Sequence, residues 1–285
     1  KQFKRRFSFE FFPPKTDKGW DKLQGVRNTL AEVDPDFFSV TFGAGGSTRD
    51  RTVQTVLDLH KRGVSTAPHL SCVGATRNGI AELLDVYRDN GINRIVALRG
   101  DMPSGMGAAG ELRYANELVS FIREYSGDTF NIEVAAYPEF HPQARTAEDD
   151  LKNFARKVEA GANSAITQYF FNADSYFYFI DRLEKMGVTI PVVPGIMPIV
   201  NFSNLTRFSD MCGAEIPRWI RKQLEAYGDD SDSIRKFGEE MVTEMCAKLI
   251  AAGAPGLHFY TLNQAEPSLS IWKNLGIGER EKIAF

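Results

Sequence analysis

The stretch Phe7-Ser8-Phe9-Glu10-Phe11-Phe12-Pro13-Pro14 places one carboxylate inside a run of phenylalanines that two prolines end. An apolar run that proline ends is typical of a short buried strand. A charged glutamate in such a strand is costly unless it is paired or protonated, and burial raises a carboxyl pKa above its free value of about 4.3. We therefore expect Glu10 to have a raised pKa, as a general acid requires. The alternative is a glutamate at the wet edge of the strand, paired with a lysine or an arginine.

Length and composition favour a single α/β domain without a nucleic-acid or membrane partner. The 285 residues suit one α/β barrel or a pair of small domains. A net charge of -3 provides no basic field for nucleic acid, and no apolar run approaches the roughly 20 residues of a membrane span. No signal peptide is visible at the start. Three widely spaced cysteines favour reduced thiols in a cytoplasmic protein, and four histidines without ligand spacing predict no metal site.

Eight predicted strands alternate with helical stretches along the chain. The strands are expected at residues 7–12, 37–42, 67–72, 94–98, 130–136, 164–168, 191–197 (broken by Pro194) and 257–261. The helices are expected at residues 17–33, 47–61 (capped by Ser47 and Thr48), 76–90, 114–125, 146–160, 173–186, 201–212, 231–252 and 267–275. Such alternation implies right-handed crossovers and a parallel sheet.

The number of units predicts a (β/α)8 TIM barrel that forms a single domain over residues 1–285. A doubly wound open sheet is the alternative. It is less favoured because the glycine turn at residues 43–48, Gly-Ala-Gly-Gly-Ser-Thr, lacks the final glycine of a dinucleotide-binding fingerprint.

Polar residues recur where the predicted strands end, which is where such barrels carry their active sites. They are Glu10, Thr41, His69, Arg99-Gly100-Asp101, Tyr137 with Glu139 and His141, Gln168, and Tyr260 with Asn263. The set is rich in hydrogen-bonding groups and aromatic rings, which suits a large planar organic ligand. It contains no Ser-His-Asp order and no strand-end lysine typical of a Schiff base.

Two further patterns suggest ligand contacts, each with a simpler alternative. In Arg99-Gly100-Asp101, the glycine lets backbone approach a ligand and the arginine can pair with a phosphate; the alternative is a solvated turn. Asp150, Asn153 and Lys157 have the spacing of one helical face. That face is either solvated or forms a wall that holds a polar ligand.

The motifs taken together resemble the short bacterial type of 5,10-methylenetetrahydrofolate reductase over nearly the whole chain. The resemblance rests on residues 7–14, 40–44, 67–70, 97–101, 135–139 with His141-Pro142, 166–168, 194–198 and 258–263. Eight ordered motifs at barrel-strand spacing are a specific pattern, although any one alone would be weak.

The resemblance implies a (β/α)8 barrel that binds FAD non-covalently and uses NADH or NADPH to reduce methylenetetrahydrofolate by a ping-pong mechanism. The product, 5-methyltetrahydrofolate, supplies methyl groups for methionine synthesis. By this resemblance Glu10 is the general acid that protonates N10 of the folate, and Asp101 is the carboxylate beside flavin and pterin. Reduced flavin then delivers hydride to the resulting iminium carbon.

Further residues acquire ligand roles only through this resemblance. The implied FAD contacts are Thr41, Phe42, Ala44, His69, Arg99, Gly100, Asp101, Tyr114, Ala115, Tyr137, His141, Ala144, Asp150, Asn153, Arg156 and Lys157. The implied folate contacts are Thr41, Asp101, Gln168, Asn204, Phe208 and Gln264, and Gln168 also contacts the nicotinamide. Asn204 and Gln264 stand where bacterial relatives often have Gln and Arg. These departures bear on how the folate tail is bound.

The resemblance also implies a homodimer or homotetramer in the cytoplasm, without the regulatory domain of eukaryotic relatives. Two other readings remain at this stage. One is another flavin-dependent barrel, such as proline dehydrogenase, which the strands carrying Glu10 and Gln168 disfavour. The other is a catalytically silent barrel that binds folate or a partner protein, which an intact Glu10 and Asp101 disfavour.

Overall fold

The computed structural model describes residues 3–42, 46–100 and 110–278. Within these residues every strand pairing is parallel, in the order β7-β6-β5-β4-β3-β2-β1-β9-β8. The strands are β1 (Arg6–Phe11), β2 (Phe37–Val40), β3 (Thr66–Ser71), β4 (Arg94–Leu98), β5 (Asn131–Ala136), β6 (Ser164–Thr167), β7 (Val192–Val193), β8 (Gly195–Ile196) and β9 (Gly256–Tyr260).

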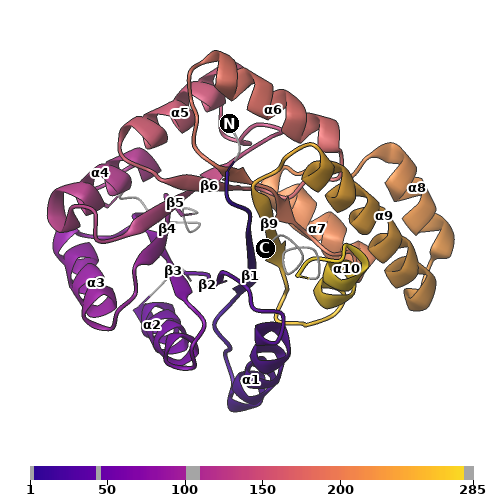
Figure 1. Cartoon of the computed structure of the whole chain (residues 1–285), viewed down its shortest axis with the longest axis horizontal. Helices are drawn as coiled ribbons and strands as arrows, with labels where there is room; N and C mark the ends of the chain where they lie inside the picture. The colour runs from indigo at the N-terminus through magenta and orange to yellow at the C-terminus, as the bar shows by residue number, and fades with distance from the viewer. Residues whose placement is uncertain (1–2, 43–45, 101–109, 279–285) are drawn as a thin grey trace.

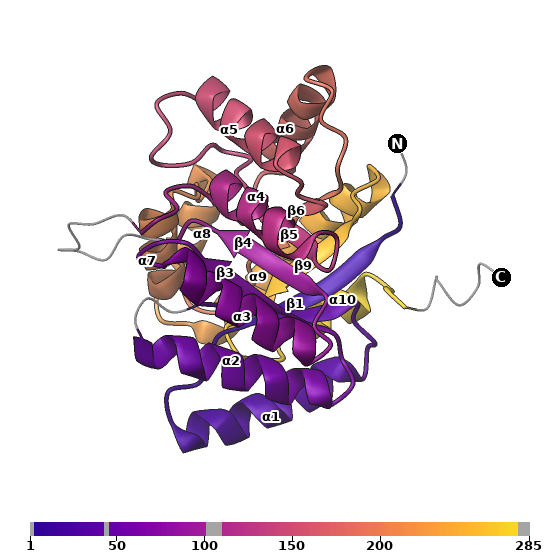
Figure 2. The same cartoon turned by 90° about the vertical axis from the view of Figure 1, so that its left-hand side faces the viewer.

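The helices lie between the strands and form an outer ring (Figure 1). They are α1 (Asp17–Ala31), α2 (Gly46–Lys61), α3 (Arg77–Asp89), α4 (Ala115–Ser126), α5 (Ala147–Glu159), α6 (Ala173–Lys185), α7 (Phe202–Cys212), α8 (Arg218–Tyr227), α9 (Ser231–Ala251) and α10 (Ser268–Asn274). Helices α1, α2 and α3 lie side by side along the outside of the barrel (Figure 2). The predicted (β/α)8 barrel is confirmed.

The barrel closes through one strand that a proline splits in two. β7 pairs with β6 and β8 pairs with β9, and only Pro194 separates β7 from β8. Proline cannot donate to a ladder, but the Pro194 carbonyl still accepts a hydrogen bond from the His258 amide at 2.9 Å. The interruption predicted at Pro194 is therefore confirmed, and the two halves act as the eighth strand of the ring.

Helix starts follow the side-chain caps that the sequence offers. The hydroxyls of Thr16, Thr76 and Thr146 accept hydrogen bonds from amides in the first turns of α1, α3 and α5. Such caps satisfy amides that have no partner within the helix. The expected starts of these three helices are confirmed.

Two helices differ from the prediction. α2 begins at Gly46, one residue before the start predicted at Ser47 and Thr48. The helix α8 was not predicted, although its buried residues Ile220 and Leu224 lie about one helical turn apart on one face. α8 packs against α9 through Trp219 and Phe237, whose ring centroids lie 6.1 Å apart.

The first strand separates an apolar outer face from a polar inner face. Side chains alternate along a strand, and Phe7 and Phe9 lie outside, with ring centroids 5.3 and 5.6 Å from that of Trp272 in α10. Ser8 and Glu10 occupy the alternate positions inside the barrel, where they contact His258 of β9. The phenylalanines thus pack the strand against the helices, and the carboxylate points into the barrel.

The described residues show neither a membrane-spanning helix nor a metal-binding group. None of the described helices has the length and apolarity needed to cross a bilayer. No group of three or more histidine, cysteine, aspartate or glutamate side chains within the described ranges is arranged to hold a metal ion.

Candidate active site

Glu10 lies near the C-terminal end of β1 and contacts side chains from three other strands. His69 Nε2 of β3 lies 3.2 Å from Glu10 Oε2, and His258 Nε2 of β9 lies 3.3 Å from the same oxygen. The Ser39 hydroxyl of β2 donates to it at 3.4 Å. The Glu10 side chain is 17% exposed. We call Glu10, Ser39, His69 and His258 the mouth cluster.

The predicted direction of the Glu10 pKa was wrong. Burial does raise this pKa, but attraction to the nearby His69, the hydrogen bond from His258 and attraction to His258 outweigh burial and lower it to about 2. Because imidazole attracts a carboxylate strongly only when protonated, the lowering depends on the charge of these rings. The alternative prediction, a lysine or arginine partner, was also wrong, since the partners are two histidines.

Tyr260 extends the mouth cluster toward β6. Its ring centroid lies 5.3 Å from that of His258, and its hydroxyl donates to the Thr167 carbonyl at 2.6 Å. Burial and the nearby Glu10 carboxylate raise its pKa well above the ordinary value, so this phenol stays protonated. Gln168, which follows Thr167 at the end of β6, lines a small cavity with Tyr137, Glu139, Tyr169 and Cys212. The structure therefore brings Tyr137 and Gln168 together, as the sequence predicted.

The ends of β2 and β4 contribute backbone as well as side chains. The Thr41 amide donates to the Phe11 carbonyl at 2.9 Å, which places Thr41 beside the end of β1. Phe42 is half-buried against the core. The Arg99 guanidinium donates to the Gln143 side chain in the loop after β5, and so joins two strand ends.

The glycine of the Arg-Gly-Asp stretch has a reason within the fold. Gly100 has a φ of 84°, and a Cβ atom there would lie 2.0 Å from Ser71 Oγ. Only glycine fits both constraints without strain. Close packing on β3 is thus sufficient to explain this glycine, whatever ligand approaches the loop.

The loop after β5 and helix α5 form a second polar group. The Tyr137 and His141 rings pack edge to face with centroids 4.6 Å apart, and the His141 amide donates to Asp150 Oδ2 at 3.1 Å. Lys157 Nζ lies 5.8 Å from the centroid of Tyr137. We call Tyr137, His141, Asp150 and Lys157 the α5 wall.

Burial shifts the pKa of both charged residues of the α5 wall. It raises the pKa of Asp150 above the ordinary value, and a hydrogen bond from the His141 amide and the charge of Lys157 oppose this only in part. It lowers the pKa of Lys157 to about 8, against the attraction of Asp150. These groups are held in a protein environment that disfavours their charges, which is common at binding sites.

Several predicted ligand residues lie away from these groups or outside the described residues. Asn153 and Arg156 are exposed and hydrogen-bond to each other at 2.8 Å, so Asn153 does not share the burial of Asp150. Tyr114 is 55% exposed. Ala44 and Asp101 fall in residues 43–45 and 101–109, outside the described part of the chain.

The remaining predicted residues lie in loops and helices that follow the strands. Asn204 is exposed in α7, and its amide donates to the Asn201 side chain; Phe208 in the same helix is half-buried under Arg207. Ala115, Ala144 and Gln264 are half-buried. The amides of Ala144 and Gln264 close turns by donating to the carbonyls of His141 and Thr261. Their ligand roles stay predictions.

Sequence reasoning missed the role of His258 and Ser39 in the mouth cluster. Both could have been found, because the first and last strands of a closed barrel are neighbours and inward positions alternate. Glu10 pairs with Tyr260 in the β1–β9 register and with Ser39 in the β1–β2 register.

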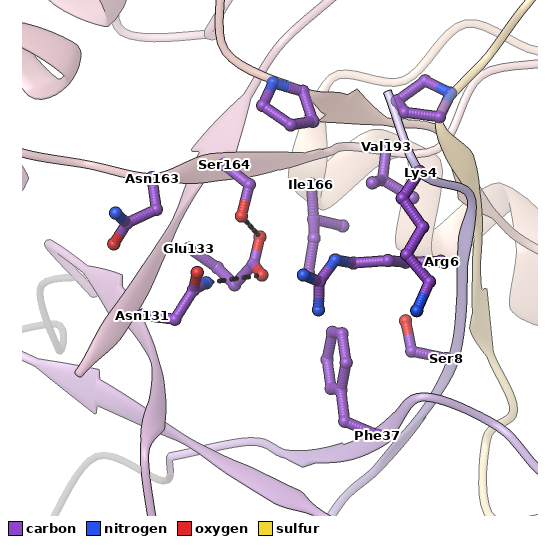
Figure 3. A pocket seen from close by; sticks show the side chains of 12 residues that line it. Lys4, Arg6, Ser8, Phe37, Asn131, Glu133, Asn163, Ser164, Ile166 and Val193 are labelled. Carbon is purple, nitrogen blue, oxygen red and sulfur yellow. Dashed lines mark hydrogen bonds between the residues drawn. The ribbon is translucent and has the colours of Figure 1, made fainter. Parts of the chain in front are cut away.

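A polar cavity lies at the opposite, amino-terminal end of the barrel. Figure 3 shows Arg6 and Ser8 on one side of it and Glu133 on the other. Glu133 is 2% exposed; Arg94 donates to its Oε1, and the Ser164 hydroxyl donates to its Oε2 at 2.6 Å. We call Arg94, Asn131, Glu133 and Ser164 the floor cluster.

Comparison with known proteins supports one family. The family model described as methylenetetrahydrofolate reductase matches residues 1–276. The 5,10-methylenetetrahydrofolate reductase of Escherichia coli is 42% identical over 271 residues, which cover 95% of this chain and 90% of that protein. A rice protein named probable methylenetetrahydrofolate reductase (NADH) is 39% identical over 292 residues, covering 98% of this chain and 49% of that protein.

A solved structure shares the fold at low sequence identity. It is an uncharacterized protein from Clostridium thermocellum, described as binding two copies of 5-methyl-5,6,7,8-tetrahydrofolic acid. The two chains align with a TM-score of 0.64 and 15% identity, over 100% of this chain and 97% of that one. At this identity the likeness supports the barrel fold and not the ligand.

Proposed function

Because this chain belongs to the methylenetetrahydrofolate reductase family, we propose that it reduces 5,10-methylenetetrahydrofolate to 5-methyltetrahydrofolate. It is accordingly an oxidoreductase. We further propose that FAD is its non-covalent cofactor and that NADH or NADPH supplies the electrons in a ping-pong cycle.

The observation that carries the proposal is the partly buried carboxylate at the C-terminal end of β1, with two imidazoles within 3.3 Å of one of its oxygens. Reduction of the substrate needs a proton at N10 to open its five-membered ring. The mouth cluster combines a carboxyl group with two side chains that exchange protons near neutral pH. Glu10 is the proposed general acid, because Oε2 has three polar neighbours while no described residue hydrogen-bonds to Oε1.

The residues at the mouth fit a ligand with rings and phosphates. Arg99 and Lys157 are cations suited to phosphate, and Tyr137 and His141 offer rings and polar atoms. The buried Nε2 of His69 makes no well-aligned hydrogen bond to a described residue, so a polar ligand atom could satisfy it. When bound, FAD would accept hydride from the nicotinamide and donate it to the folate carbon.

The residues of this chain would orient the two substrates in turn. Lys157, Arg99 and Thr41 would hold the cofactor, and Asp150 would fix the loop that carries His141. Gln168, next to Tyr137 in a shared cavity, would contact the pterin and the nicotinamide alternately. One binding face used in turn is the physical basis of a ping-pong cycle.

Other assignments extend this proposal. Asp101 would lie beside flavin and pterin, and Thr41, Asn204, Phe208 and Gln264 would complete the folate site. Ala44, Gly100, Tyr114, Ala115, Ala144, Asn153 and Arg156 would complete the cofactor site. We also propose a homo-oligomer that works in the cytoplasm and supplies methyl groups for methionine synthesis.

An anaerobic spectroscopic titration tests the proposal. The purified protein, supplied with FAD, should show a flavin absorption band that bleaches when NADH is added; NADH comes first because the rice relative is named for it. Adding methylenetetrahydrofolate should restore the band. A protein that binds no FAD would contradict the cofactor, and a bleached band that methylenetetrahydrofolate leaves unchanged would contradict the substrate.

A further inference from the structure

His258 is buried at the centre of a hydrogen-bonded line of three side chains. Its side chain has 0% exposure. Its Nδ1 lies 2.7 Å from the Ser8 hydroxyl, and its Nε2 lies 3.3 Å from Glu10 Oε2. Ser8 and His258 are partners in the β1–β9 register, and Glu10 is the next inward residue of β1. Both ring nitrogens are therefore engaged by residues of the first strand.

The mouth cluster poses a difficulty for a general acid. Burial raises the pKa of Glu10, but attraction to His69 and His258 and the hydrogen bond from His258 outweigh it and lower this pKa to about 2. A carboxylate with this pKa does not keep a proton near neutral pH. The proton must then rest on another group of the cluster and reach Glu10 during the reaction, since coupled groups titrate as a unit.

The geometry distinguishes the two imidazoles. His69 Nε2 lies 3.2 Å from Glu10 Oε2, but it is not aligned for a hydrogen bond. His258 Nε2 does form a hydrogen bond to that oxygen, and the ring is fixed on its far side by Ser8. A proton held by His258 thus has a direct path to the carboxylate.

We propose that His258 stores the proton that Glu10 passes to the substrate, and that Ser8 is a positioning residue that accepts a hydrogen bond from His258 Nδ1–H. In this arrangement Nε2–H is directed at Glu10. The inference deepens the proposed function, because it concerns the proton used in that reaction.

The proton transfers balance without another reactant. The Nε2–H bond of the His258 imidazolium breaks and an O–H bond forms on Glu10 Oε2. Rotation of the carboxyl group presents this proton to the mouth, where the O–H bond breaks and an N–H bond forms at N10. His258 is left neutral with its proton on Nδ1, still bonded to Ser8, and Glu10 is again a carboxylate. Solvent restores the proton at the mouth once the product leaves.

Ser8 suits the role of acceptor because its hydroxyl also lines the cavity at the amino-terminal end of the barrel (Figure 3). A serine that accepts from Nδ1–H must direct its own hydrogen elsewhere, and the cavity gives it room. Ser8 therefore connects the buried ring to a polar space without competing for the ring proton.

The charged and titratable groups near His258 come from several strands. Glu10 of β1 and Tyr260 of β9 contact the ring, and His69 of β3 contacts Glu10. Phe37 stacks on His258 with centroids 6.1 Å apart, and the Arg94 guanidinium of β4 packs over the same phenyl ring. Lys4, Arg6 and Glu133 line the cavity that Ser8 also lines. Glu10 is the only described anion in hydrogen-bond contact with the imidazole.

Nitrogen-15 NMR of histidine-labelled protein tests the storage role without measuring turnover. The His258→Gln variant identifies the His258 resonances in the spectrum. We expect Nδ1 to stay protonated across about pH 6 to 8, with Nε2 gaining its proton toward the acidic end. In Ser8→Ala, the neutral ring should shift toward the tautomer with Nε2–H. Wild-type Nδ1 that carries no proton across this range would overturn the proposal.

Rapid-mixing kinetics provide the matching functional test. His258→Gln should slow reoxidation of the reduced enzyme by methylenetetrahydrofolate by about 10- to 100-fold, and leave its reduction by NADH within about twofold. As the pH rises, the rate of reoxidation by methylenetetrahydrofolate should begin to fall at a lower pH in Ser8→Ala than in the wild type. Ser8→Thr should restore the wild-type pH profile. His60→Gln, at the end of α2 and outside the mouth cluster, is the control for substituting a histidine.

The two tests separate failure of this inference from failure of the proposed function. Wild-type protein that fails to react with methylenetetrahydrofolate overturns the proposed function, and the NMR result then decides the state of His258 by itself. If wild type reacts but His258→Gln and Ser8→Ala keep its rate and pH profile, the proposed function stands and the storage role is wrong.

Discussion

Glu10 and Glu133 lie inside the barrel at opposite ends, and their partners differ in kind. Glu133 of the floor cluster is bound by the Arg94 guanidinium, the Ser164 hydroxyl and the Asn131 amide. Glu10 of the mouth cluster is bound by two imidazoles and a serine. Arginine keeps its proton at all ordinary pH values, whereas histidine gains and loses one near neutrality.

This difference indicates which carboxylate can do chemistry. A guanidinium fixes the charge of its partner, so the floor cluster is suited to hold strands β4, β5 and β6 together. Imidazoles make the charge of their partner depend on pH and on ligands, so the mouth cluster is suited to exchange a proton. The same residue type in the same barrel thus has a structural role at one end and a proposed catalytic role at the other.

The largest effect on stability should come from breaking the floor cluster. We expect Glu133→Ala to lower the free energy of unfolding by about 3–5 kcal/mol, because it leaves the buried Arg94 without its counter-ion. Urea titration followed by circular dichroism measures the change. The control is Asp85→Ala, which removes an exposed partner of Arg88 and should cost about 0–1 kcal/mol. Equal losses in the two variants would refute a structural role for Glu133.

The mouth cluster should instead change stability with pH. The pKa of Glu10 is lowered from 4.5 to about 2, so its contribution is present above pH 4.5 and is lost as the pH falls through about 2. The wild type should exceed Glu10→Gln by on the order of 2–3 kcal/mol above pH 4.5, and the gap should close in acid. Unfolding titrations at several pH values would measure it. A gap that does not change between pH 5 and about pH 2 would contradict the assigned ion pairs.

Lys157 of the α5 wall offers a further contrast with Glu10 and Glu133, because it is a cation whose pKa burial has lowered to about 8. Its ammonium is disfavoured in the folded protein, which costs stability below this pKa and no longer does so above the ordinary value of 10.5. On the proposed function, Lys157→Met should weaken FAD binding about 10-fold while leaving stability unchanged or improved. Fluorescence titration with FAD gives the affinity, and unchanged FAD affinity would remove Lys157 from the cofactor site.

The smallest effect should come from Tyr260, which borders the mouth cluster. Tyr260→Phe removes the hydrogen bond from its hydroxyl to the Thr167 carbonyl and should cost about 1 kcal/mol. Because the ring remains beside His258, we expect the pH profile of folate reduction to keep its shape. Thermal unfolding together with that profile tests both points. A displaced profile would mean that the phenol takes part in the proton exchange.

The sequence predicted the fold well where local chemistry is strong. Threonine caps at Thr16 and Thr76 and the break at Pro194 depend on neighbouring residues alone, and all three were confirmed. Helix α8 was missed although Ile220 and Leu224 mark one buried face, because most of its other residues are charged or polar.

The site was harder to predict because it depends on contacts between distant residues. Burial alone suggested a raised pKa for Glu10, but the closure of the barrel brings His258 to within 3.3 Å, 248 residues away in sequence. That contact reverses the direction of the shift. The proposed general acid was therefore visible in the sequence, while its charge state was not.

The central claim, that Glu10 and not Glu133 carries the exchangeable proton, is tested most directly by the rate at which methylenetetrahydrofolate reoxidises the reduced enzyme. The account predicts that Glu10→Gln slows this half-reaction by about 10²- to 10⁴-fold, while NADH still reduces the enzyme at a rate within about twofold of wild type. Glu133→Gln, if folded, should keep both rates. A Glu10→Gln enzyme that reduces methylenetetrahydrofolate at the wild-type rate would contradict the account.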